Sequence, residues 1–269
     1  MTYVALSPLD LALAASLLLV NVAVSQAFRL GVERTLLVSA ARMVVQLLLI
    51  GLVLKWIFAQ TSPVWTLALA AVMVAVAAYE VRTRQERQIG GLLAIGLGGG
   101  ALLFVGTVAT MVAVAGIIRP DPWYAPRYVL PILGMVLGNA LTGTSLVLDS
   151  LTRGAWRERP AIEARLALGA TRREALGGVV RDAMKTGMMP IVNAMAASGL
   201  VSLPGMMTGQ ILAGVDPVDA TKYQILIMFL IAGATALSVL LAGLGGLLLL
   251  TDERHRLRLD RLSPPHGRS

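Results

Sequence analysis

Long apolar runs without charge constrain this chain more than any other feature. Six runs contain no Asp, Glu, Lys or Arg, and each can cross a bilayer, which takes roughly 20 residues of helix. Residues 36–58 give a seventh candidate that admits only Arg42 and Lys55. The six runs are residues 11–28, 61–79, 89–118, 128–148, 186–215 and 223–250. Because hydrocarbon does not tolerate unpaired backbone groups, the sequence predicts an all-α integral membrane protein with seven transmembrane helices.

Composition supports this class and excludes several others. Hydrophobic residues make up 57% of the 269 residues and charged residues 14%, whereas a soluble domain carries roughly 25% charged residues. Cysteine is absent, which excludes disulfides and thiolate metal sites. No Gly-x-x-x-x-Gly-Lys-Ser/Thr phosphate loop occurs, so ATP hydrolysis by that route needs another polypeptide. The first run follows no basic segment, so we expect it to stay as a span and not to be cleaved as a signal peptide.

The basic residues predict the orientation of the spans. With the N-terminus outside, the cytoplasmic segments hold eighteen Lys and Arg residues and the outside segments hold four. The positive-inside rule therefore places the N-terminus outside and the C-terminus in the cytoplasm. The net charge of +8 is then a topology signal and a contact surface for lipid headgroups, and not a nucleic-acid-binding feature. We expect a single transmembrane domain over residues 1–269, with a flexible tail over residues 252–269.

One loop, residues 152–185, is long, charged and helix-forming. A proline suits the first helical turn, and Glu163 follows near the helix N-terminus, where the dipole favours an acid. Gly169 permits a bend, and Thr171 with Glu174 matches a capping box for a second helix. The loop therefore predicts a helix, a Gly-Ala-Thr corner and another helix on the cytoplasmic side, between the fifth and sixth spans.

Small and polar residues form one stripe on the fifth span. At about 100° per residue, the stripe contains Gly134, Gly138, Thr142, Ser145 and Asp149. Two interpretations are open. Small and hydroxyl residues let helices pack closely, or the stripe lines a translocation path with Asp149 as its functional charge.

The second span carries Arg42 and Gln46 one helical turn apart. The arginine either snorkels to the headgroups or pairs with a buried acid such as Asp149.

The sixth span is interrupted by Pro204 and Gly205. Proline removes a helical hydrogen bond, and broken helices in transporters often mark the substrate path, although a structural kink is the equal alternative. Met206 and Met207 would be soft ligands, better suited to copper(I) than to iron, or fillers of irregular gaps. The candidate path residues are Arg42, Gln46, Gly138, Asn139, Thr142, Ser145, Asp149, Asn193, Pro204, Met206, Met207 and Gln210. No set of metal ligands is assigned.

Five blocks resemble the FetB-type ABC-transporter permeases. They are residues 42–47, 134–140, 159–171, 203–214 and 223–229, so the resemblance runs from the second span to the seventh. It implies a bacterial inner-membrane permease linked to iron export, with plant relatives linked to aluminium tolerance. It also implies a homodimer that works with a separate ATPase, which binds ATP and Mg; the chain itself binds no cofactor and is not an enzyme.

In ABC permeases a cytoplasmic helix beginning Glu-Ala and closing on a glycine presses into a cleft of the ATPase. The residues that the resemblance assigns to this coupling helix are Arg159, Glu163, Ala164, Leu168, Gly169 and Thr171.

One departure weakens the importer interpretation. Importer permeases follow this helix with an isoleucine and a Leu-Pro pair, where this chain has Val179 and then Arg181 and Asp182. Two other classes remain open: an ion-coupled secondary transporter, which needs an ion site for which Asp149 is nearly the only available acid, and a membrane adaptor that transports nothing.

Overall fold

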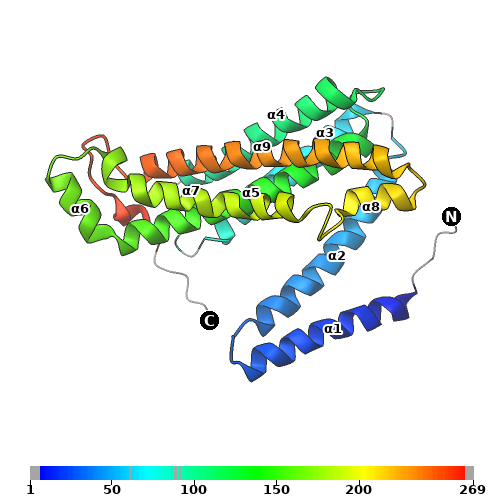
Figure 1. Ribbon diagram of the computed structural model, residues 1–269, viewed down its shortest axis with the longest axis horizontal. Helices are drawn as coiled ribbons and strands as arrows, with labels where there is room; N and C mark the ends of the chain where they lie inside the picture. The colour runs from blue at the N-terminus through cyan, green and yellow to red at the C-terminus, as the bar shows by residue number, and fades with distance from the viewer. Residues whose placement is uncertain (1–6, 61, 86, 88–89, 91, 264–269) are drawn as a thin grey trace. The chain divides into compact units, whose positions relative to one another are not determined.

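The computed structural model describes residues 7–60, 62–85, 87, 90 and 92–263, which form two compact units of helices, Met1–Thr61 and Ser62–Ser269 (Figure 1). The described residues contain helices and two isolated β-bridges but no strand. The helices are α1 (Pro8–Ala27), α2 (Glu33–Ile57), α3 (Pro63–Thr83), α4 (Leu92–Met111), the π-helix η1 (Val112–Ile118), α5 (Pro126–Arg157), α6 (Arg159–Ala167), α7 (Arg172–Ala197), α8 (Gly205–Leu212), α9 (Pro217–Leu249) and the 3-10 turn η2 (Leu259–Arg261).

The first unit is a hairpin of α1 and α2. Ser7 and Asp10 form a capping box at the start of α1, which satisfies backbone donors that the first helical turn leaves free. At the turn, the Ser25 hydroxyl donates to Glu33 Oε2 at 2.7 Å and accepts from the backbone N–H of Val32 at 3.3 Å. A side-chain network therefore fixes the turn between the two helices.

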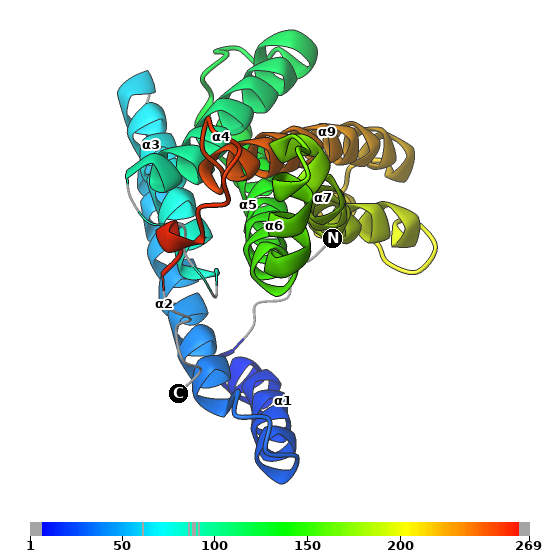
Figure 2. The same ribbon diagram turned by 90° about the vertical axis from the view of Figure 1, so that its left-hand side faces the viewer.

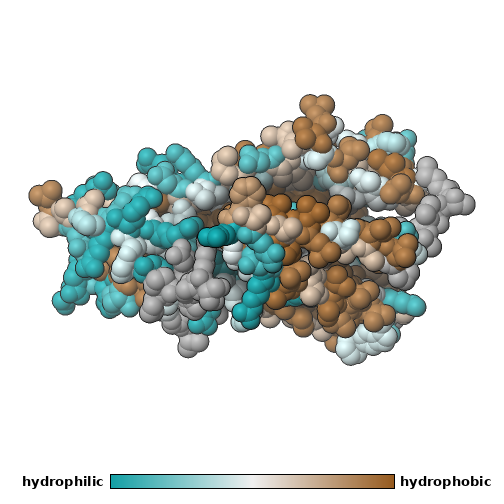
Figure 3. Space-filling model, turned by 90° about the horizontal axis from the view of Figure 1, so that it is seen from below, coloured by the Kyte–Doolittle hydropathy of each residue, from teal (hydrophilic) through white to brown (hydrophobic). Residues whose placement is uncertain are grey.

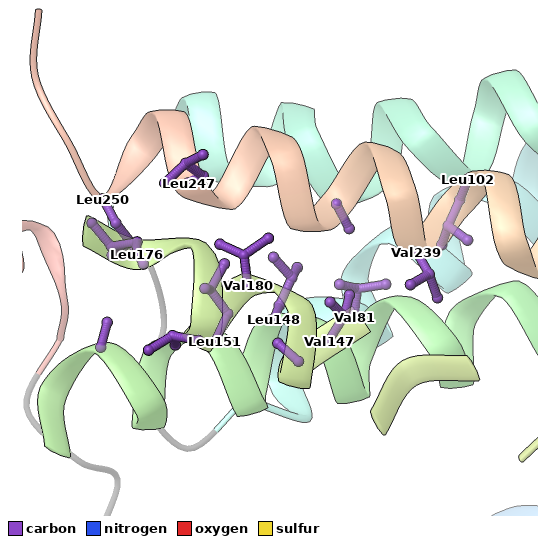
Figure 4. Packing of buried hydrophobic residues seen from close by; sticks show 14 of the residues in the cluster. Val81, Leu102, Val147, Leu148, Leu151, Leu176, Val180, Val239, Leu247 and Leu250 are labelled. Carbon is purple, nitrogen blue, oxygen red and sulfur yellow. The ribbon is translucent and has the colours of Figure 1, made fainter. Parts of the chain in front are cut away.

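The second unit is a bundle in which α5, α7 and α9 all pack against one another, with α3 and α4 against α5 and α4 also against α9 (Figure 2). Near the end of the bundle that carries α6, the core residues Leu151, Leu176 and Leu250 come from α5, α7 and the end of α9 (Figure 4). A second cluster, which includes Val136 and Ile227, continues the core toward the other end. We call the first end the α6 end and the second the α8 end.

Two glycines bring α5 and α7 into backbone contact. A Cβ added at Gly187 would lie 2.8 Å from the carbonyl oxygen of Gly143, and one added at Gly143 would lie 3.1 Å from the carbonyl oxygen of Gly187. Val239 of α9 packs against the same point, 3.0 Å from the Gly143 position. Because apolar lipid supplies no hydrophobic force between helices, such close packing is what holds a membrane bundle together.

Several helices start where the sequence supplies a cap followed by proline. The Ser62 hydroxyl accepts from the backbone N–H of Val64 ahead of α3, and the Asp216 carboxylate accepts from two backbone N–H groups ahead of α9. Pro63 and Pro217 then occupy the first turn, where no N–H is needed.

Six helical segments of the described residues are long and apolar enough to cross a membrane: Leu9–Ala27, Glu33–Ile57, Pro63–Thr83, Gly96–Ile118, Pro126–Arg157 and Pro217–Leu249. The sixth predicted span, residues 186–215, is not one helix. Its first part is the uncharged half of α7, which ends at Ala197, and its last part is α8. The interruption predicted from Pro204 and Gly205 is confirmed, but it is wider than a kink and occupies residues 198–204.

The C-terminal segment differs from the flexible tail expected from sequence. Residues 252–263 fold back on the bundle, with Leu259 buried and Leu257 and Leu262 packed against the core. Arg261 Nη1 donates to the carbonyl oxygen of Leu249 at 2.8 Å, which satisfies an acceptor at the end of α9. The physical reason is that leucines alternate with charged residues here and can face the core together. Residues 264–269 lie outside the described part.

The glycine crossing makes a stability prediction. Gly187→Ala should destabilise the bundle by roughly 1–3 kcal/mol, because the new methyl group meets a backbone carbonyl that only a helix shift can move. Gly178→Ala on the same helix is the matched control, since nothing lies within 4 Å of its added Cβ. Thermal unfolding in detergent measures both variants. Equal midpoints for the two would contradict a tight crossing at Gly187.

Candidate functional site

The predicted corner between two helices is present at the α6 end. Arg159 begins α6, and its Nε lies 2.8 Å from Glu163 Oε1 one turn later. Ile162 is fully buried and anchors α6 to the core; burying such a side chain contributes about 1.5–3 kcal/mol. Gly169 has a φ of +90°, a conformation that glycine adopts without strain.

A capping box starts the second helix of the corner, as the sequence predicts. The backbone N–H and the hydroxyl of Thr171 each donate to Glu174 Oε2 at 2.8 Å, and the Glu174 N–H donates back to the Thr171 hydroxyl at 3.4 Å. These hydrogen bonds hold the pKa of the Glu174 carboxyl below its ordinary value. Arg165 closes the corner by donating to the carbonyl oxygen of Ala175 at 3.1 Å. The structure therefore gathers the six predicted coupling residues on one α6–Thr171 corner.

Leu168 stands out on this corner. It is 88% exposed, although hydrophilic side chains gather at this end of the molecule (Figure 3). The preceding turn is anchored by Ile162, so the corner presents an apolar side chain on a firmly held support. Glu163 and Ala164 are exposed on the same short helix.

The folded-back tail adds a second feature to the α6 end. A cavity of about 620 Å³ is lined by Arg159 and Glu163 together with tail residues that include Asp260. On its wall the Arg87 guanidinium lies 4.0 Å from the centre of the Trp156 ring, a cation–π contact. A hydrogen bond from Arg258 lowers the pKa of Asp260 to about 2. The tail thus shares a charged surface with the predicted coupling residues.

The stripe on α5 contains buried, half-exposed and exposed positions, the exposed one being Gly138. Thr142 donates to the carbonyl oxygen of Gly138 at 3.0 Å, and Asn139 donates to that of Met135 at 2.9 Å, so both bond to their own helix. Ser145 is buried, and its hydroxyl has no hydrogen-bond partner among the described residues.

Two candidate charges lie in different units. Asp149 forms an ion pair with Arg153, one turn further along α5. Arg42 and Gln46 lie one turn apart on α2, exposed within the first unit. The pairing of Arg42 with Asp149 stays a prediction.

The break between α7 and α8 is a compact turn next to a cavity. Gly199 has a φ of +92°, and its N–H donates to the carbonyl oxygen of Ser202 at 2.9 Å. Pro204 is the N-cap of α8. The adjoining cavity has a volume of about 550 Å³ and is lined by Pro204 and Met207, among others.

The remaining candidates near the break, Met206, Asn193 and Gln210, do not lie together in one site. Met206 packs against the core, as a gap filler would. Asn193 is exposed on α7. Gln210 Oε1 is buried without a hydrogen-bond partner among the described residues, and Gln210 is not part of the cavity lining.

Sequence reasoning missed the polar residues that α9 contributes to this cavity. Gln224 is 8% exposed, and its Oε1 has no hydrogen-bond partner within the described chain. Thr221 lies beside it and donates to Met207 Sδ at 3.9 Å and to a backbone carbonyl at 2.8 Å. The available signal was a lone amide in an apolar span, since an intramembrane polar residue is a functional candidate.

Within the described residues no three His, Cys, Asp or Glu side chains cluster as metal ligands would. The cavity at the break offers thioethers, one amide and hydroxyls, and the α5 stripe offers hydroxyls and one paired carboxylate. These groups can contact a passing ion, but they do not form a charged chelating site.

Comparison with known proteins gives a consistent set of relatives. The model of the Uncharacterised protein family (UPF0014) matches residues 8–248. The probable iron export permease protein FetB of Escherichia coli is 34% identical over 257 residues, which is 94% of this chain and 95% of the relative. The UPF0014 membrane protein YjkA of Bacillus subtilis is 37% identical over 86% of this chain and 90% of its own. ALUMINUM SENSITIVE 3 of Arabidopsis thaliana is 35% identical over 84% of this chain and 81% of its own. No solved structure matches.

The two interpretations of the polar positions, path lining and close packing, make different predictions for thiol labelling. The chain has no cysteine of its own, so single cysteines can be introduced and labelled directly. If the positions line a path, Thr142→Cys and Gln224→Cys should react with a small water-soluble thiol reagent in at least one conformational state. Val147→Cys is the matched control, because Val147 is fully buried on the same helix as Thr142 and carries no polar group. Resistance of all three positions in every state would mean that the stripe and the cavity only pack.

Proposed function

We propose, from the premise that this chain belongs to the UPF0014 family, that it is the membrane-spanning permease subunit of an ABC transporter. The transporter exports iron or a related metal ion, and a separate subunit binds Mg and ATP and hydrolyses the nucleotide. The permease is a bacterial inner-membrane protein with its N-terminus outside and its C-terminus in the cytoplasm. The name of the FetB relative supports iron as cargo and export as direction.

The exposed Leu168 on the α6–Thr171 corner is the observation that carries this proposal. Leu168 gives the corner an apolar contact point, and a partner cleft that covered it would gain the free energy of removing this side chain from water. The corner is short, projects from the charged end of the bundle and is held by Ile162 and by the capping box of Thr171. These are the properties expected of a helix that presses into a cleft of a separate ATPase.

A seventh crossing is consistent with the broken segment. The uncharged half of α7 and the whole of α8 contribute about 18 Å and 12 Å at ~1.5 Å per residue. Together they approach the thickness of about 30 Å that the hydrocarbon core requires. In Figure 1, α8 continues beyond the end of α7. With six uninterrupted spans, this crossing puts the two termini on opposite sides.

The cargo path in this proposal follows the α5 stripe and the break. Thr142 and Ser145 supply hydroxyls, and Gln224 supplies an unpartnered amide oxygen. Neutral oxygen ligands suit a hard cation and bind it loosely enough to release it. Arg42 and Gln46 remain candidates from the first unit.

An ion-coupled secondary transporter is the second candidate and has less support. It would need a coupling-ion site in the membrane, and Asp149, the acid of the α5 stripe, is already paired with Arg153.

Transport into everted membrane vesicles tests the proposal. Vesicles that contain the permease and its ATPase should accumulate iron only with hydrolysable ATP, and an ionophore that collapses the proton gradient should leave the rate unchanged. Gradient-driven uptake without ATP would identify a secondary transporter. Vesicles with an ATPase that cannot hydrolyse ATP are the control.

The corner makes a direct prediction about assembly. One chain supplies one corner, and ABC ATPases close as a pair, so the solubilised complex should contain two permeases and two ATPases. Leu168→Asp should leave the permease folded but remove the ATPase from the complex, because a charge would be buried in the cleft. Val218→Asp is the matched control, since Val218 is 63% exposed near the start of α9 and lies outside the apolar run of residues 223–250. Native mass measurement checks all three proteins. If the Leu168→Asp complex retained both ATPases, the ATPase would not bind at this corner.

A further inference from the structure

We propose that the groove between α7 and α9 is a binding site for an anionic phospholipid. The groove has a volume of about 650 Å³, and its rim carries Arg173, Arg181 and Lys185 from α7. These residues are eight and four positions apart, so they follow one face of the helix. This lipid site does not depend on the proposed transport function, and a binding measurement alone tests it.

The walls of the groove suit an acyl chain. Met184 and Met188 line it from α7, and Leu240 and Leu244 line it from α9. Both leucines are 45% exposed, so the groove is an open apolar channel and not part of the packed core. The glycine at position 243 allows the helices to approach, since a Cβ there would lie 2.6 Å from Met184 Cε.

The part of the rim formed by Arg181 and Lys185 lies at the depth of the lipid headgroups, and Arg173 lies about 12 Å further from the membrane along α7. α9 carries no charge from Tyr223 to Leu250, and Leu244 lies about 30 Å along the helix axis from Tyr223. This distance matches the thickness of the hydrocarbon core. On α7 the same level is where the charged half ends, at Lys185. The apolar walls therefore extend into the membrane while the basic rim stays at its surface.

The charge of the rim selects the headgroup. Lys185 Nζ lies 3.9 Å from Asp182, a loose ion pair with both side chains exposed. No acidic group of the described chain lies within ion-pair distance of Arg173 or Arg181. The rim therefore keeps a net positive charge, which favours a headgroup of net negative charge over a zwitterionic headgroup.

The same charge argues against a second copy of this chain as the occupant. A two-fold interface would place this basic face against itself, so that like charges would oppose one another. A phospholipid suits both parts of the groove, because its phosphate contacts the basic rim and its acyl chain lies between the apolar walls.

The test measures lipid binding to the delipidated, purified permease by native mass spectrometry. Phosphatidylglycerol should bind more tightly than phosphatidylcholine, and Arg181→Gln/Lys185→Gln should weaken phosphatidylglycerol binding roughly ten- to thirtyfold. The control Arg157→Gln/Arg254→Gln removes two charges from exposed residues outside the groove and should leave the binding unchanged. Equal affinity for the two lipids, or equal loss in the control, would overturn the proposal.

A fluorophore on Leu244→Cys locates the lipid. Phosphatidylglycerol with brominated chains should quench it at a lower mole fraction than brominated phosphatidylcholine does, and the Arg181→Gln/Lys185→Gln variant should abolish this preference. Efficient disulfide formation between Leu244→Cys of two copies, or between Leu244→Cys and a cysteine placed on α2, would identify a protein occupant and overturn the proposal.

Discussion

The contact between the backbones of Gly143 and Gly187 is the constraint on which the rest of the bundle depends. Inside a membrane, apolar side chains gain little by leaving lipid for protein, so helices associate only where they fit closely. At this crossing α5 and α7 approach until a single methyl group would meet a carbonyl oxygen, and Val239 of α9 fills the remaining space. The three helices that carry the α6–Thr171 corner, the break and the cavity are thereby held in one arrangement.

That arrangement gives α7 a particular role. It is one helix of 26 residues, or about 39 Å at 1.5 Å per residue. It starts at the Thr171 cap on the corner and ends at the turn beside the cavity, and it crosses α5 between these two points. A helix cannot be compressed along its axis without breaking its hydrogen bonds, so movement of the corner and movement of the break are mechanically linked. Pro190 lies in the half nearer the break, where the missing hydrogen bond permits bending.

The sequence predicted features that local chemistry determines. The cap at Thr171, the bend at Gly169 and six of the seven predicted apolar spans need only neighbouring residues, and these are present. Features that depend on distant contacts were missed. The small residues of the fifth span were recognised as packing candidates, but the glycine that meets α7 is Gly143, which lies off the predicted stripe. The C-terminal leucines pack on helices far away in sequence, and the place of Gln224 beside a cavity depends on the packing of α7 and α8 against α9.

The polar groups inside the bundle bear on the proposed path, because the part of the chain that the structure describes holds no charged metal site. Six buried side-chain oxygens have no hydrogen-bond partner among the described residues, and they belong to Thr110, Thr144, Ser145, Gln210, Gln224 and Thr235. Burying such a group unpaired costs about 1–3 kcal/mol, so selection for stability alone would replace it by an apolar residue. A chelating cluster of carboxylates would bind a metal ion too tightly to release it, whereas separate neutral oxygens offer weak successive contacts. The presence of these unpaired oxygens, despite their cost in stability, is thus consistent with a bundle that lets a polar cargo pass.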